Sequence, residues 1–116
     1  GGAHSGERCL RVPAGKGVKT QWLMPIPESR KVRIRLWYRT PEGANLRVTA
    51  ALFASQRWLG RYADIVSLDA TGGQWALSET TLAFSDAEAT YFDIEFNAAG
   101  QTCYVDDIEI LAVPSQ

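Results

Sequence analysis

Two pairs of carboxylates are the side chains of this sequence best placed to do chemistry. Asp93 and Glu95 stand one residue apart in YFDIEFN, and Asp106 and Asp107 are adjacent in TCYVDDIEI. Paired carboxyl groups hydrolyse glycosides when a sugar ring fits between them. Neighbours this close in a strand leave no room for a ring, so the pairs do not predict a glycosidase.

Other patterns of catalysis are also missing from the sequence. The single histidine is His4, so no serine or cysteine has an evident partner base. The chain contains no GxSxG elbow, no HExxH motif and no glycine-rich phosphate loop. We therefore expect a protein that is not an enzyme.

The adjacent pair Asp106 and Asp107 lies inside an apolar segment that otherwise alternates like a strand. In a regular strand one of the two carboxylates would point into the interior. Burial of a carboxylate is costly unless a cation or hydrogen-bond donors meet it. Either a positive group lies there, or a β-bulge lets both carboxylates bond to backbone N–H groups or to arginines.

Strands are the elements expected to position these residues. Residues 31–40, 45–55 and 91–97 alternate apolar and polar side chains with a period of two. Shorter candidate strands cover residues 7–12, 18–26, 57–68, 74–84 and 102–111. Turn signals separate the candidates about every ten to fifteen residues, which is typical of sandwiches. The sequence predicts one all-β domain over residues 1–116, an antiparallel two-sheet β-sandwich of jelly-roll type.

Charge is divided unevenly along the 116-residue chain. All 12 Lys and Arg residues lie in residues 1–61, whereas residues 62–116 hold ten of the 13 acidic residues. We expect basic and acidic strands to lie side by side. The near-zero net charge argues against nucleic-acid partners, and no apolar run is long enough to cross a bilayer. GGAHSGER lacks signal-peptide features, so we expect a mature segment of a longer protein.

Cys9 and Cys103 lie near opposite ends of the chain, in the expected first and last strands. A disulfide between them would close a long loop and would suit a secreted protein. The alternation instead turns Cys9 outward and Cys103 inward, which favours a buried free thiol. Both interpretations stay open.

The order of the motifs HSGERCL, KVRIRLWYR, TGGQW, YFDIEF and YVDDIEI resembles the carbohydrate-binding modules of the galactose-binding-like jelly-roll group. The modules attached to xylanases and glucanases are the most similar. The resemblance implies noncatalytic binding of a polysaccharide or oligosaccharide by an extracellular monomer. It also implies that the module is an accessory domain of a glycoside hydrolase.

The resemblance further implies a structural Ca²⁺ ion. In these modules the first Asp of the Asp-Asp pair coordinates calcium beside carbonyl groups of the HSG loop. Carried over to this chain, Asp106 would be the side-chain ligand, and the segment from Ser5 to Arg8 would supply carbonyls.

Sugar binding needs flat apolar rings flanked by polar side chains. Trp37 is the leading candidate because its neighbours in sequence take the core positions, which leaves its indole on the open face. The expected site also contains Arg33, Arg35, Arg39, Tyr91, Asp93 and Glu95, with Trp58 and Tyr62 at its rim. Trp22 and Trp75 are expected to have structural roles.

The arginine row of residues 33, 35 and 39 allows two interpretations. The guanidinium groups could hold the carboxylates of uronic acids, or they could pair with Asp93 and Glu95 across the sheet. A different class of function also remains open, in which the domain is a structural or protein-interaction sandwich of a larger surface protein. The outward Trp37 and the arginines would then be its contact patch.

Overall fold

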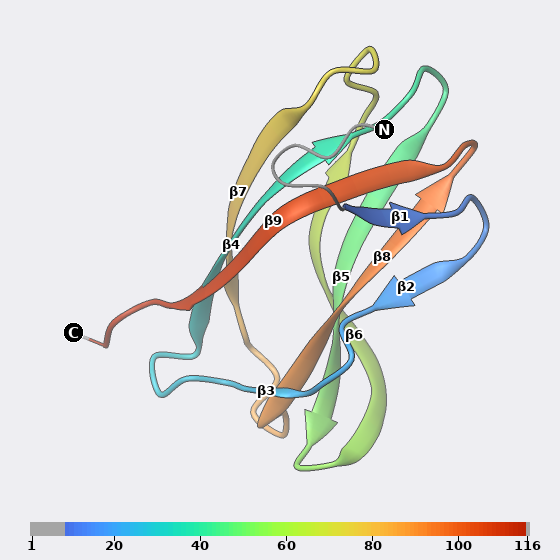
Figure 1. The fold of residues 1–116 in the computed structure, drawn as a ribbon. Helices are drawn as coiled ribbons and strands as arrows, with labels where there is room; N and C mark the ends of the chain where they lie inside the picture. The colour runs from blue at the N-terminus through green and yellow to red at the C-terminus, as the bar shows by residue number, and fades with distance from the viewer. Residues whose placement is uncertain (1–8, 116) are drawn as a thin grey trace.

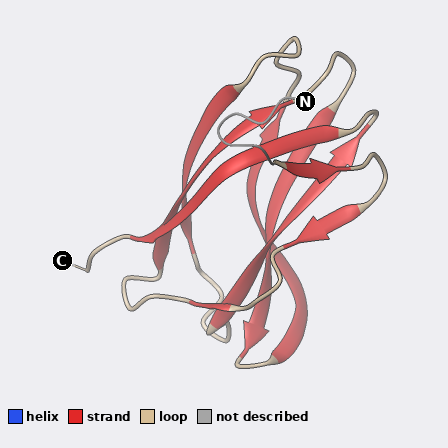
Figure 2. Ribbon diagram, viewed as in Figure 1, coloured by secondary structure: helices blue, strands red, loops and turns tan. Residues whose placement is uncertain are grey.

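The structure is a computed structural model and describes residues 9–115. These residues form nine strands: β1 (Leu10–Val12), β2 (Gly17–Lys19), β3 (Met24–Pro25), β4 (Lys31–Arg39), β5 (Asn45–Ala54), β6 (Arg57–Leu68), β7 (Ala76–Ala83), β8 (Tyr91–Ala99) and β9 (Cys103–Ala112). All regular secondary structure in this part of the chain is strand (Figure 2). Within it, no helix is long and apolar enough to span a membrane.

The strands form two antiparallel sheets that pack face to face (Figure 1). Sheet A has the order β1-β9-β4-β7. Sheet B has the order β2-β8-β5-β6, and the short β3 also pairs with β8. The prediction of an all-β, antiparallel two-sheet β-sandwich is therefore confirmed.

Alternation within the strands builds the core between the sheets. Val32, Ile34 and Leu36 of β4 are buried, whereas the basic residues between them are exposed. Sheet B contributes Phe92, Ile94 and Phe96 of β8 with Leu46, Val48, Ala50 and Leu52 of β5. Each large apolar side chain buried in this way contributes roughly 1.5–3 kcal/mol to stability. Because the even-numbered residues of β5 and β8 fill the core, their odd-numbered neighbours cover the outer face of sheet B.

A β-bulge in β9 allows Asp106 and Asp107 both to lie outside the core. Arg35 pairs with Glu109, but Trp37 pairs with Asp106, so β9 holds one residue more than β4 at this point. Asp107 adopts a φ of 51°, in the left-handed region. The extra residue keeps both carboxylates out of the core, and the Asp107 backbone N–H donates to Oδ1 of Asp106 at 2.8 Å. The β-bulge of that interpretation is confirmed, together with the bond from a backbone N–H to the carboxylate of Asp106.

Basic and acidic strands lie side by side as expected, but the acidic neighbours of β4 are β7 and β9 and not β8. Arg35 of β4 forms ion pairs with Glu79 of β7 at 3.2 Å and with Glu109 of β9 at 3.9 Å. The prediction that the arginines of β4 pair with Asp93 and Glu95 is wrong, because β4 and β8 belong to different sheets.

The two cysteines are free thiols in the structure. Cys103 is fully buried on the inner face of β9, as the alternation predicts, and its Sγ lies 3.6 Å from the carbonyl oxygen of Gln101. Cys9 is half-buried just before β1. Burial raises the pKa of the Cys103 thiol.

The segment between β7 and β8 is an irregular turn held by arginines. Arg30 donates to the carbonyl oxygens of Ala89 at 2.8 Å and Asp86 at 2.5 Å. Arg61 of β6 pairs with the carboxylates of Asp86 at 2.7 Å and Glu88 at 2.9 Å. These contacts fix the turn directly before Tyr91, at the start of β8.

Candidate functional site

The outer face of sheet B carries the carboxylates of β8 beside residues of β5 and β2. Asp93 pairs with Ala51 of β5, and Glu95 pairs with both Thr49 of β5 and Lys19 of β2. Ala51 carries only a methyl group and is 2% exposed. Its small side chain therefore forms the floor of a depression beside Asp93. A concave patch therefore lies at the centre of this face.

An irregularity of β6 brings two aromatic rings together at the edge of this patch. Trp58 lies opposite Phe53 and Tyr62 lies opposite Ala51, so four residues of β6 span two of β5. Gly60, with a φ of 73°, lies within the added stretch. Tyr62 consequently takes the position next to Trp58 on the same face, and their ring centroids are 5.9 Å apart at 67°.

Three depressions that share lining residues lie next to one another on this face, and together we call them the sheet-B groove. The first, of about 330 Å³, is lined by Lys19, Ala51, Phe53, Trp58, Tyr62, Asp93 and Glu95. The second, of about 280 Å³, is lined by Lys19, Thr20, Gln21, Trp22, Leu23, Phe53 and Asp93. The third, of about 520 Å³, is lined by Leu23, Ser55, Gln56 and Tyr91. Each depression shares at least one lining residue with the next.

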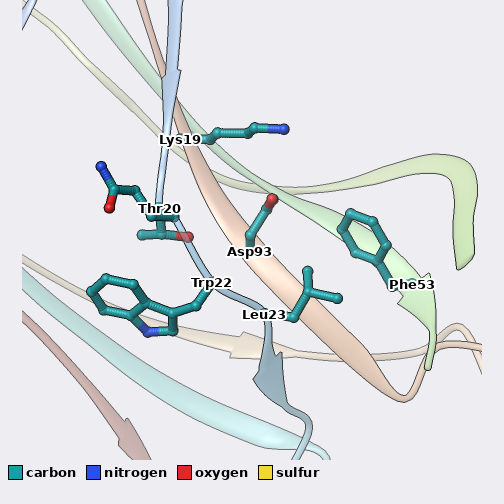
Figure 3. Close-up of a pocket in the computed structure, with 7 residues that line it drawn as sticks. Lys19, Thr20, Trp22, Leu23, Phe53 and Asp93 are labelled. Carbon is teal, nitrogen blue, oxygen red and sulfur yellow. The ribbon is translucent and has the colours of Figure 1, made fainter. Parts of the chain in front are cut away.

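Asp93 is the most unusual side chain of the groove. It is 4% exposed, and among residues 9–115 its Oδ1 has no hydrogen-bond partner. Burial raises the pKa of Asp93, against the opposing effects of the Lys19 charge and the Ala51 backbone. In Figure 3 the carboxylate points away from its strand into the space between Lys19 and Phe53. A buried carboxylate oxygen without a partner is costly unless a ligand donates to it.

Glu95 extends the same environment along β8. Burial is the largest cause that raises its pKa, and the nearby charge of Asp93 raises it further. Lys19 acts in the opposite direction on both carboxyl groups. The two acids therefore lie in a place that is poor in positive charge.

Five of the predicted site residues belong to this groove. Asp93, Glu95, Trp58 and Tyr62 line its first depression, and Tyr91 lines the third. Trp58 and Tyr62 are each 51% exposed, which is unusual for such large rings. The acidic and aromatic part of the prediction is thus assembled on one face.

The other four predicted site residues lie on β4, in sheet A. Trp37 is half-buried and lies across the ladder from Leu77 and Asp106. Arg33 is exposed on the same strand, and Arg35 is engaged by the acids of its neighbouring strands. The predicted single platform of Trp37 with Asp93 and Glu95 is therefore wrong, because the core of the sandwich separates the two outer faces.

Arg39, the last of these four, is held between aromatic rings. Its guanidinium carbon lies 5.2 Å from the ring centroid of Trp75 and 4.7 Å from that of Tyr104. Both distances fit cation–π contacts. The structural role expected for Trp75 agrees with this packing.

Lys19, Phe53 and Trp22 were not predicted as site residues. The alternation of residues 45–55 places Leu52 inside, so an outward Phe53 was available as a signal. Trp22 was expected to be structural, which is wrong, because it is 67% exposed in the loop between β2 and β3. In Figure 3 its indole lies on the opposite side of that loop from Phe53, at the margin of the groove.

The described residues do not assemble the expected calcium site. Asp106 lies on the outer face of sheet A, and no three His, Cys, Asp or Glu side chains of residues 9–115 gather to hold a metal ion. The other expected contributors, Ser5 and Arg8, lie outside the described residues. Calcium binding therefore stays a prediction.

Comparison with known proteins does not identify a family. No protein-family model matches the sequence, and no curated protein matches it. The class that the fold defines is an antiparallel β-sandwich, and functional interpretation depends on the groove alone.

Proposed function

We propose that the sheet-B groove binds a polysaccharide or oligosaccharide without catalysing a reaction on it. In a longer extracellular protein, such binding would hold an attached glycoside-active enzyme near its substrate and raise the local concentration of sugar chains. The observation that carries the proposal is the buried carboxylate of Asp93, whose Oδ1 has no hydrogen-bond partner among residues 9–115, beside exposed aromatic rings.

The rings supply the apolar part of sugar recognition. Trp58, Tyr62 and Phe53 line one side of the first depression. Flat rings pack against the C–H faces of pyranoses, and they lose little conformational entropy on binding because they have few rotatable bonds. Rings on adjacent strands of a sheet offer such a surface without rearrangement of the backbone.

The polar side chains supply the directional part. Asp93 and Glu95 accept hydrogen bonds from sugar hydroxyls, and Lys19 donates to ring or hydroxyl oxygens. A donor from the ligand would relieve the cost of the unpaired Asp93 oxygen. The groove is therefore preorganised for a hydroxyl-rich ligand.

The length of the groove favours a chain over a single sugar. Three depressions follow one another from the Trp58–Tyr62 pair to Tyr91 at the start of β8. Affinity is expected to rise with oligosaccharide length until the groove is filled, and then to remain constant.

The test is titration of the protein with a panel of soluble xylan, mixed-linkage glucan, mannan, pectin and alginate, followed by affinity electrophoresis and calorimetry. Trp58→Ala is expected to weaken binding of whichever glycan binds by roughly 30-fold or more, while the circular dichroism spectrum is unchanged. Trp37→Ala on the opposite face is the matched control and is expected to retain binding.

Two outcomes would overturn the proposal. Binding that is lost in the Trp37→Ala protein and kept in the Trp58→Ala protein would place the site on sheet A. A complete lack of retardation by every glycan would reject sugar binding and would favour a protein-contact role for the exposed rings.

A further inference from the structure

The balance of charge in the sheet-B groove points to a more specific ligand than a neutral sugar. Its first depression contains two carboxylates, Asp93 and Glu95, and one ammonium group, Lys19. Among residues 9–115, none of these three forms an ion pair within 4.0 Å. One negative charge is thus left over where the surface is concave.

Other charges on the outer face of sheet B do not compensate it. Arg47 of β5 already pairs with Asp64 of β6 at 2.5 Å. Arg57 and Arg61 pair with the acids of the turn before β8. The arginines of β4 lie on the far side of the core. No arginine of residues 9–115 lines the groove, so beyond Lys19 a ligand would be the source of additional positive charge there.

We infer that the sheet-B groove prefers a glycan with free amino groups, such as an oligomer of glucosamine. This inference rests on the proposed function, because it names the class of sugar that the same groove takes. The sugar ammonium would lie between the carboxylates of Asp93 and Glu95 and the rings of Trp58 and Tyr62.

Both sides of the depression favour a cation. The carboxylates accept charge-assisted hydrogen bonds from an ammonium group, which offers three donors. The exposed faces of Trp58, Tyr62 and Phe53 attract a cation through their ring quadrupoles. A hydroxyl group in the same place makes the hydrogen bonds but gains neither the ionic attraction nor the cation–π contact.

The same arrangement disfavours the acidic sugars that the arginine row suggested. A uronic acid carboxylate would lie beside two carboxylates of the protein, and like charges held close together repel. The groove is therefore expected to reject pectin and alginate chains.

Lys19 sets the strength of the preference. It is exposed on the edge strand β2, and its flexible stem lets the ammonium move into solvent when a cation enters. While it remains near the carboxylates, it competes with the ligand for them. Lys19→Gln removes this competitor and is expected to raise the ratio of affinities for glucosamine and glucose oligomers.

The decisive experiment compares β-1,4-linked oligomers of glucose and of glucosamine of equal length. The two differ in each sugar only by a hydroxyl or an ammonium at one carbon. Calorimetry at low salt is expected to show about tenfold tighter binding of the glucosamine oligomer, and the difference is expected to shrink in 1 M salt.

Isosteric variants then assign the preference to the carboxylates. Asp93→Asn and Glu95→Gln remove charge with little change in shape, and each is expected to reduce the ratio of affinities for glucosamine and glucose oligomers. Asp64→Asn is the matched control, since it removes an acid from the same face that already has a partner. It is expected to keep the preference.

The outcomes separate this inference from the proposed function. Equal affinity for the two oligomers, tighter binding of an oligouronate, or an unchanged preference in both carboxylate variants would overturn the inference while glycan binding stands. Failure of every oligomer and polysaccharide to bind would overturn both. Thermal unfolding of each variant shows that a lost preference is not a lost fold.

Discussion

The two outer faces of the sandwich use the same kinds of residue in opposite ways. On sheet A, Arg35 meets Glu79 and Glu109, and Arg39 is stacked against Trp75. Charges and rings there satisfy one another within the chain. On sheet B, the rings of Trp58 and Tyr62 are half exposed, and the carboxylates beside them have no ion-pair partner among the described residues.

This difference indicates that the outer face of sheet A is stabilised by contacts within the chain, whereas the outer face of sheet B has groups available to a ligand. Internally paired groups contribute a little to stability and leave nothing for a ligand. Unpaired buried acids and exposed rings cost stability in the free protein. Their concentration on one face is the physical reason to place a ligand there.

Carboxyl groups within sheet B and its loops show the same contrast. Hydrogen bonds from Arg61 lower the pKa of Asp86 and of Glu88. Burial raises the pKa of Asp93 and of Glu95. The first pair stabilises the turn before β8, whereas the second pair faces the groove.

The largest expected effects come from replacing a tryptophan on each face and comparing the results. Trp58→Ala should weaken glycan binding by about 2 kcal/mol or more, roughly 30-fold in Kd, with little change in stability. Trp75→Ala should leave binding intact and lower the free energy of unfolding by about 1–3 kcal/mol, since it removes a half-buried ring and its contact with Arg39. Calorimetry and urea unfolding measure the two quantities. Loss of binding in the Trp75→Ala protein together with retained binding in the Trp58→Ala protein would contradict the contrast drawn between the two faces.

A smaller effect is expected from removing the buried charge. Asp93→Asn should raise the free energy of unfolding at pH 7 by about 1 kcal/mol, because the carboxylate is desolvated and its Oδ1 is unpartnered. Asp86→Asn should instead lower stability, because it removes the ion pair with Arg61. Urea unfolding of both variants at one pH provides the comparison. A loss of stability in the Asp93→Asn protein would contradict it.

The pH dependence of stability should show whether the charge of Asp93 destabilises the folded protein. The folded state raises the pKa of Asp93, so it holds the proton more tightly than the unfolded chain, whose ordinary value is 3.8. The destabilisation is therefore absent below pH 3.8 and grows as the pH rises through the higher pKa of the folded state. The gain in stability of Asp93→Asn over the native protein should appear across that window. A gain that stays constant from pH 3 to pH 8 would show that the charge is not its cause.

The smallest effect is expected on sheet A. Arg35→Ala should cost less than about 1 kcal/mol, because the Arg35 side chain is 45% exposed and its ion pairs are screened by solvent and salt. It should not change glycan affinity. A strong loss of binding in this variant, measured by calorimetry, would show that the faces are not independent.

Local patterns predicted the strands well because the period of two is a property of consecutive residues. The alternation of residues 31–40 and 45–55 matches β4 and β5 to within one residue. The outward direction of Asp93, Glu95 and Tyr91 also followed from parity. These inferences needed no knowledge of what lies across the sheet.

Sheet membership and irregular backbone could not be predicted in the same way. Parity places Trp37 and Asp93 outside, but only long-range packing decides that their strands belong to different sheets. The adjacent carboxylates gave a β-bulge at Asp106 and Asp107 as one of two interpretations, whereas the added residues around Gly60 change register without a strong signal in composition. For this reason the acidic half of the site was predicted and its partners on β2 and β5 were missed.

The distortion around Gly60 has a second consequence, for assembly. β6 is the outermost strand of sheet B, and a straight outermost strand offers its free backbone groups to the same strand of another molecule. The extra residues between Trp58 and Tyr62 interrupt that row of donors and acceptors. Straightening the strand by deleting two residues there would therefore restore an uninterrupted edge and is expected to invite fibrous self-association.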